Sequence, residues 1–172
     1  MKKKVTLLFF CAMLLLGLWW TFNFISQDGE FTKLGHSTVG IENWKDRKPI
    51  YIGYPVKWEG MGKPRLKKIE FIKRDGIIVA KDDKEFTIQP FIASTERIGA
   101  LDEKSVKEDG LDKDFVSVKD YKVNGEFYLV LRVEFHATNP INDINTLRIT
   151  YEKLGVTQVQ NIHFDDGVIT VE

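Results

Sequence analysis

The sequence predicts an all-β domain, an antiparallel two-sheet β-sandwich of the immunoglobulin-like kind, preceded by one N-terminal transmembrane helix. Three features lead to this prediction: an uncharged apolar run near the N-terminus, apolar residues at alternate positions after residue 49, and turn residues between the alternating stretches. Strands with one apolar face need a second sheet to cover it, which favours a sandwich. A small barrel is the alternative, and the cysteine and tryptophan framework of true immunoglobulin domains is missing.

Residues 5–25 form the expected transmembrane segment. They carry no charge, and about 20 residues at about 1.5 Å each span a hydrocarbon core of about 30 Å. A secretory signal has a shorter apolar core followed by small residues at its cleavage site, whereas this run ends in aromatic residues. We therefore expect a retained anchor, with Trp19 and Trp20 at the membrane interface. A cleaved signal and a secreted protein are the alternative.

The charges beside this segment predict a single-pass orientation. Lys2, Lys3 and Lys4 precede it, and the positive-inside rule keeps such a basic flank in the cytoplasm. The single cysteine, Cys11, lies in the membrane segment, and no N-x-Ser/Thr acceptor occurs, so a bacterial cell envelope is favoured. The expected order is a cytoplasmic tail (residues 1–4), a transmembrane anchor (5–25), a polar tether (26–48) and an extracytoplasmic domain (49–172).

The first strand of the domain is expected at residues 50–58, where every second residue is apolar. Pro55 interrupts this strand and lacks an N–H, so the strand is expected at a sheet edge or with a bulge. Pro90 predicts the same for a strand near residues 86–92. A first strand at residues 38–41, inside the expected tether, is an alternative interpretation.

Turn residues divide the domain into about eight or nine strands. The pair Asp75-Gly76 predicts a hairpin between residues 65–74 and 76–81, and Asn124-Gly125 predicts one between residues 114–123 and 126–136. The strand at 126–136 is apolar on both faces and is expected to be central in its sheet. Further strands are expected at residues 147–152, 156–164 and 168–171. Residues 101–114 have too few apolar positions to bury a helix face, so no helix is expected outside the anchor.

No pattern in the chain indicates catalysis. A G-x-S-x-G motif is absent, Cys11 lies in the membrane, and none of the three histidines is spaced as a general base beside a nucleophile. The glycine-containing stretch at residues 59–64 precedes an expected strand rather than the helix that a phosphate loop requires. The protein is therefore expected not to be an enzyme and to need no cofactor.

A metal- or calcium-dependent sensor or enzyme is the alternative function. His163 and Asp165 share one side of an extended chain, and His136 could lie on a neighbouring strand to complete a His/His/carboxylate set. Carboxylates also alternate at residues 109–114, but without the residue order of an EF-hand loop. The simpler interpretation is a polar strand end and a turn.

One charge cluster indicates a possible contact with an anionic surface. Over twelve residues, six basic side chains face a single acid, Glu70. They could rest on anionic lipid headgroups or on an anionic wall polymer, or could simply protect an edge strand from pairing. The six residues are Lys63, Arg65, Lys67, Lys68, Lys73 and Arg74.

Together these features predict a membrane-anchored extracytoplasmic module that binds or scaffolds. Without the three N-terminal lysines, 22 basic residues face 25 acidic ones, which does not favour nucleic acid as a partner. The expected partners are membrane lipid and an envelope protein or an anionic wall polymer.

Overall fold

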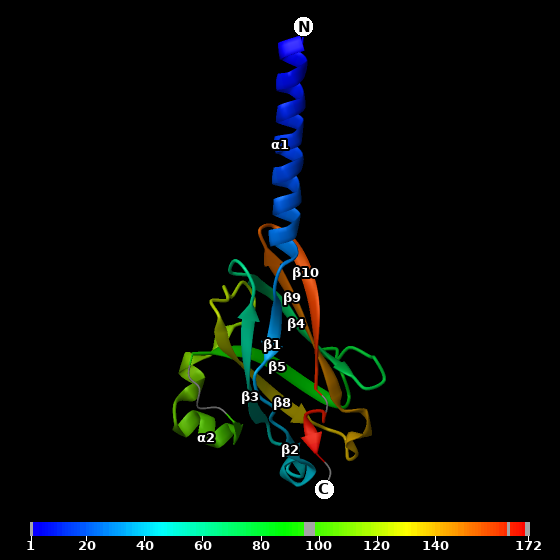
Figure 1. Ribbon diagram of the computed structural model, residues 1–172. Helices are drawn as coiled ribbons and strands as arrows, with labels where there is room; N and C mark the ends of the chain where they lie inside the picture. The colour runs from blue at the N-terminus through cyan, green and yellow to red at the C-terminus, as the bar shows by residue number, and fades with distance from the viewer. Residues whose placement is uncertain (1, 95–98, 165, 171–172) are drawn as a thin grey trace.

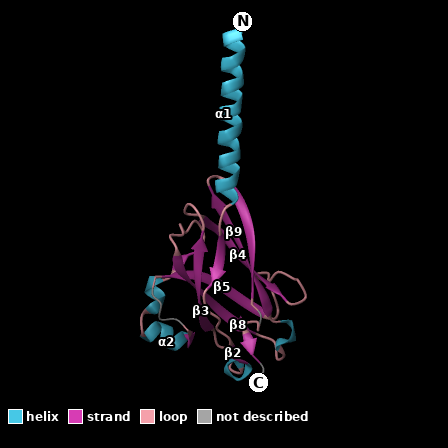
Figure 2. Ribbon diagram, viewed as in Figure 1, coloured by secondary structure: helices cyan, strands magenta, loops and turns pink. Residues whose placement is uncertain are grey.

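The computed structural model describes residues 2–94, 99–164 and 166–170. A single long helix, α1 (Lys2–Gln27), projects from a mostly β domain built of antiparallel sheets (Figures 1 and 2). From Thr6 to Gln27 this helix is long and apolar enough to cross a membrane, and its most apolar stretch is not buried against the domain. The predicted N-terminal apolar helix is confirmed, and its length and composition suit either a membrane anchor or a signal sequence.

The larger sheet has six strands, and β8 lies between β3 and β5. Strands β1 and β6 pair with different parts of β3, on the side opposite β8, and β7 pairs with β5. The central position predicted for residues 126–136 is therefore confirmed. The strands are β1 (Glu30–Lys33), β3 (Ile50–Glu59), β5 (Phe86–Ala93), β6 (Ala100–Asp102), β7 (Val116–Ser117) and β8 (Glu126–Phe135).

A three-stranded antiparallel sheet has the order β10-β9-β4, with β4 (Arg65–Lys73), β9 (Ile144–Lys153) and β10 (Val156–His163). The tight turn from β9 to β10 places Leu154 and Gly155 at φ of 53° and 79°, as a two-residue hairpin loop requires. A third, parallel pair joins β2 (Val39–Gly40) to β11 (Ile169–Thr170).

The two larger sheets share one hydrophobic core. Phe31 of β1 lies 4.9 Å from Trp58 of β3 and 5.1 Å from Tyr151 of β9, measured between ring centroids. A smaller cluster on the other face of β8 includes Val130 and is covered by α2 (Glu103–Glu108). Both faces of β8 are therefore buried, which is why its sequence is apolar on both sides.

The predicted lack of a helix outside the anchor is wrong. The side chain of Asp102 accepts a hydrogen bond from the backbone N–H of Ser105 and caps α2, and Val106 is completely buried. A helix this short needs only one buried side chain, so its sequence shows no amphipathic pattern. The described residues also form three short 3-10 helices: η1 (Ile41–Trp44), η2 (Leu111–Asp114) and η3 (Pro140–Asn142).

The two predicted hairpins form their turns but not their full strand pairs. Gly76 and Gly125 have φ of 85° and 84°, yet residues 77–79 add only a bridge to β4, and β7 pairs with β5 instead of β8. Residues 120–123 bond to the start of β4 instead, since Leu66 N–H donates to the Tyr121 carbonyl at 2.9 Å. The chain crosses from one sheet to the other before the turn at Gly125.

The edge position predicted for the strand with Pro55 is also wrong, because β3 has partners on both sides. The Pro55 carbonyl accepts from Leu34 N–H at 2.9 Å, just beyond the end of β1. In an antiparallel ladder the N–H and C=O of one residue point to the same side. The ring nitrogen of Pro55, which carries no hydrogen, therefore faces the part of the β3 edge between β1 and β6. No strand pairs with β3 there among the described residues, so no ladder hydrogen bond is lost.

Residues 26–48 differ from the expected polar tether. They contain β1, β2 and η1, and Phe31, Val39 and Trp44 are buried in the main core. Their sequence looks polar because only one residue in each short element points inward. The alternative interpretation, a short strand near residues 38–41, corresponds to β2.

Candidate functional site

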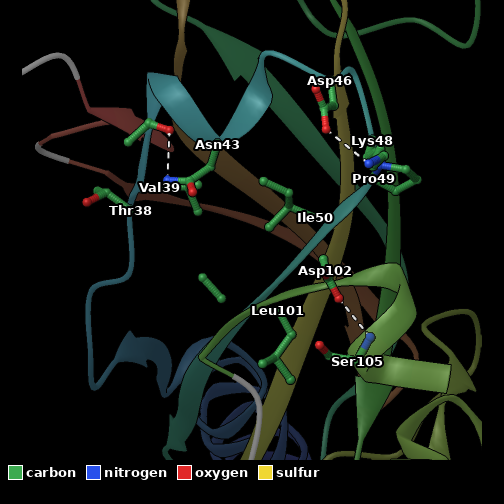
Figure 3. Close-up of a pocket in the computed structure, with 12 residues that line it drawn as sticks. Thr38, Val39, Asn43, Asp46, Lys48, Pro49, Ile50, Leu101, Asp102 and Ser105 are labelled. Atoms are coloured by element: carbon green, nitrogen blue, oxygen red, sulfur yellow. Dashed lines mark hydrogen bonds and ion pairs between the residues drawn. The ribbon is translucent and has the colours of Figure 1, made fainter. Parts of the chain in front are cut away.

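A hollow of about 510 Å³ lies at the end of the domain opposite α1. Figure 3 shows it between β2 and η1 on one side and β6 and the start of α2 on the other, with Ile50 of β3 between these walls. A second hollow, of about 560 Å³, shares Lys48, Pro49 and Asp102 with it and continues along α2. Because they share these residues, the two hollows form one continuous surface at the end of the domain opposite α1.

The first wall is held by η1. The side chain of Asn43 donates to the Gly40 carbonyl at 3.3 Å, and the ring of Trp44 is buried against Phe135 of β8, with centroids 6.2 Å apart. Asp46 and Lys48 follow and form an ion pair of 3.0 Å in which both side chains are 71% exposed. An exposed pair of this kind contributes little to stability and is free to exchange partners.

The second wall is the short strand β6 and the cap of α2. Asp102 accepts from Ser105 N–H at 2.7 Å, and this backbone hydrogen bond is the main cause of its lowered pKa. Asp102 therefore stays ionised and holds the first turn of α2. This hydrogen bond gives Asp102 a structural role at the start of α2.

The outer edge of β6 borders this hollow. Gly53 N–H donates to the Gly99 carbonyl at 2.8 Å. Because hydrogen-bonded and non-bonded pairs alternate in an antiparallel ladder, this bond determines which β6 residues bond to β3. Ala100 is one residue further on, so its N–H and C=O point away from β3. Within the described residues no named strand pairs with that edge.

The three histidines lie apart and have separate partners. His136 contacts the Thr87 hydroxyl at 2.9 Å, His163 contacts the Thr146 hydroxyl at 3.1 Å, and His36 lies 3.6 Å from the Asp166 carboxylate. The described part of the chain contains no group of three His, Cys, Asp or Glu side chains arranged to hold a metal. Asp165, the third member of the predicted set, lies outside the described residues.

The acidic stretch at residues 109–114 connects two helical turns. Asp109 ends α2, and Gly110 adopts a left-handed conformation with φ of 66° before η2 begins. This glycine reverses the chain direction between the two turns.

The six predicted basic residues do not form one patch. Strand β4 runs from the α1 end of the domain to the opposite end, so Lys63 and Arg65 lie near α1 whereas Lys73 and Arg74 lie far from it (Figure 1). Lys67 is 3.1 Å from both Asp120 and Glu152. The other pairs are Lys68 with Glu70 at 2.5 Å, and Lys73 with Asp83 at 2.9 Å and Glu85 at 2.8 Å.

Sequence reasoning missed the hollow. Its walls come from two segments of the chain, one expected as a tether and the other expected to form no helix. No motif marks either segment, and β6 is only three residues long. The pairing of β6 with the start of β3 is a long-range contact, which a local pattern does not encode.

The fold and this site define a class only: a mostly β domain with an N-terminal helix suited to a membrane or a signal. Comparison with known proteins finds no matching family model, no matching curated protein and no matching solved structure.

Proposed function

We propose that the protein is a membrane-anchored, extracytoplasmic β-sandwich of the bacterial cell envelope that binds a partner protein and does not catalyse a reaction. The observation that carries this proposal is the hollow bordered by the open edge of β6, at the end of the domain turned away from α1. A single core shared by two sheets supports the sandwich architecture. The hydrogen bonds from Gln158 and Lys153 to the end of α1 and the residue that follows it support retention of the helix as an anchor.

The partner we propose is an extended polypeptide segment. The edge of β6 offers the N–H and C=O of Ala100, which suit addition of a strand. The ion pair of Asp46 and Lys48 lies beside this edge and provides one charge of each sign for a side chain of the partner. A wall polymer, the other expected partner, would not use the backbone edge.

A photo-crosslinking amino acid placed in the hollow of the full-length chain tests this function. We expect an adduct of discrete mass in native membranes when the group replaces Asn43 or Lys48. The control position is Val159, which is 59% exposed on β10 in the smaller sheet. Equal adducts at all three positions would contradict a binding site in the hollow.

The substitution Ala100→Pro tests the role of the edge. It removes an N–H that points away from β3 and leaves the β3–β6 hydrogen bonds in place. We expect the adduct to disappear while the thermal unfolding midpoint changes little. An adduct that persists in this variant would show that strand addition at β6 is not the mode of binding.

A further inference from the structure

We propose that the domain rests directly on the bilayer, with the β3–β4 loop and the β9–β10 turn inside the outer lipid headgroup layer. This inference depends on α1 acting as the anchor, which is part of the proposed function, but it does not depend on the hollow. It names a second interaction surface, at the opposite end of the domain, whose partner is the lipid headgroup layer.

The connection between α1 and the domain is short. Only Asp28 and Gly29 separate the last residue of α1 from the first residue of β1. Ser26, still in the helix, is 2% exposed because the domain already covers it. The connection is thus too short to let the domain move away from the end of the helix.

Side chains of the three-stranded sheet donate hydrogen bonds to carbonyl groups at and just beyond the end of α1. The Gln158 amide donates to the Ser26 carbonyl, and the Lys153 ammonium donates to the Asp28 carbonyl. Lys153 also lies over the Trp58 ring, 5.3 Å from its centroid. A cation at the C-terminal end of a helix interacts favourably with the helix dipole, so these contacts fix the domain to α1.

The β3–β4 loop is packed against the same junction. Met61 N–H donates to the Asp28 carboxylate at 2.8 Å. A Cβ atom on Gly29 would lie 2.8 Å from the Cα of Gly60, so two glycines allow the two backbones to touch. The loop therefore stays at the level of the helix end.

Helix length sets that level relative to the lipid. Twenty residues from Val5 rise about 30 Å, the thickness of the hydrocarbon core, and reach Phe24. Trp19 and Trp20 then lie about 6 to 8 Å inside the outer edge of that core, somewhat deeper than the interface position expected from the sequence. The headgroup layer extends about 5 to 7 Å further on each side. Asp28 lies about 6 Å beyond Phe24, within that distance, so the loops that touch Asp28 lie among the headgroups.

The side chains at these loop tips suit that layer. Met61 and Leu154 are 48% and 54% exposed although both are apolar, and Lys63 is exposed beside Met61. Figure 1 shows the β9–β10 turn and the β3–β4 loop at the end of the domain that carries α1. Apolar side chains with a nearby lysine are typical of protein surfaces at the membrane interface.

Fluorescence quenching in vesicles tests the proposal with the full-length chain. In a Cys11→Ser background, a fluorophore is attached to Met61→Cys, Leu154→Cys or, as a control, Ile141→Cys. Ile141 is 75% exposed and lies in η3, far from α1 (Figure 1). Vesicles of phosphatidylcholine, with or without phosphatidylglycerol, carry a nitroxide on the headgroup.

We expect quenching at positions 61 and 154 to exceed that at 141 several-fold, equally in neutral and anionic vesicles, because the helix sets the position. If the chain resists carbonate extraction but all three positions are quenched equally, the anchor stands and the contact of the two loops with the headgroups is overturned. Quenching confined to anionic vesicles would overturn positioning by the helix in favour of charge attraction. Extraction of the chain by carbonate would overturn the anchor as well as this proposal.

An insertion provides a second test. Ten Gly and Ser residues between Gln27 and Asp28 give a flexible link with a root-mean-square span of about 17 Å. We expect quenching at position 61 to fall to the level at position 141. Unchanged quenching would show that the junction does not hold the loops in the headgroups.

Discussion

Asp143 shows at the scale of one residue how a buried charge organises this domain. It is completely buried, and its carboxylate accepts from the backbone N–H groups of Ile144 at 2.6 Å and of Val168 and Ile169 at 2.7 Å each. Burial raises the pKa of Asp143, and the three backbone hydrogen bonds oppose that rise. The residue joins the start of β9 to the last described strand, β11.

The substitution Asp143→Asn should lower the free energy of unfolding by about 1 to 3 kcal/mol. An amide has one acceptor oxygen and cannot accept all three hydrogen bonds, so at least one buried N–H loses its partner. Urea unfolding monitored by circular dichroism measures the change. The control, Asp46→Asn at an exposed position, should change the free energy by less than about 0.5 kcal/mol.

Lys73 and Asp83 form a nearly buried ion pair, and the partly exposed Glu85 also pairs with Lys73. Burial alone would raise the pKa of Asp83, but hydrogen bonds from Lys73 and from the backbone N–H groups of Glu85 and Phe86 together outweigh it and lower the pKa. A lowered pKa means that the stabilisation is complete above the pKa of an unfolded carboxyl group. It is lost as pH falls through the lower value in the folded state.

The variant Asp83→Asn should therefore lose less stability than the wild type between about pH 5 and about pH 2. The buried Asp143 acts in the opposite direction in the same pH range, because its raised pKa favours the folded state at low pH, and it is present in both proteins. The difference between their urea midpoints isolates Asp83. Parallel pH profiles would contradict a stabilising role for its charge.

At the scale of elements, turns follow from local sequence and strand pairing does not. Asp75-Gly76 and Asn124-Gly125 both form turns, since a positive φ depends on the residue itself. Which strand lies beside β8 depends on distant segments that compete for its two edges, and β3 and β5 occupy both. The pattern of β8 indicated that it was central, but not which strands were its neighbours.

The contact between Gly29 and Gly60 gives a prediction for the junction of α1, β1 and β3. The substitution Gly60→Ala should destabilise the domain by about 1 to 3 kcal/mol, because the new methyl group would overlap the backbone of Gly29. Thermal unfolding of the detergent-solubilised chain measures the loss. Gly99→Ala is the matched control, since a Cβ there has no neighbour within 4 Å and should leave the midpoint nearly unchanged.

At the scale of the whole molecule, the segment after α1 belongs to the folded domain. A chain of residues 28–172 should unfold cooperatively, whereas a chain of residues 49–172 should not, because it lacks three buried core side chains: Phe31, Val39 and Trp44. Loss of a buried Phe or Trp side chain costs about 3 to 5 kcal/mol, comparable to the whole stability of a small domain. Circular dichroism melts of both chains measure this, and equal midpoints would restore the tether interpretation.

The proposed retention of α1 as an anchor also has a direct test. Mass spectrometry of the protein from membranes should find Trp19 and Trp20 retained, since the domain buries Ser26 at the end of α1. A mature chain that begins after residue 25 would show instead that the segment is a cleaved signal.

The sequence by itself determined the apolar helix, the alternation of the long strands, the positions of the turns and the central place of β8. These depend on composition and on the period of neighbouring residues, both of which are local properties. Only the tertiary structure decided the partners of each strand, the burial of Phe31, Val39 and Trp44, the short helix α2 and the hollow beside β6. Each of these requires segments far apart in the chain to meet, and their free energy comes from contacts that no local pattern contains.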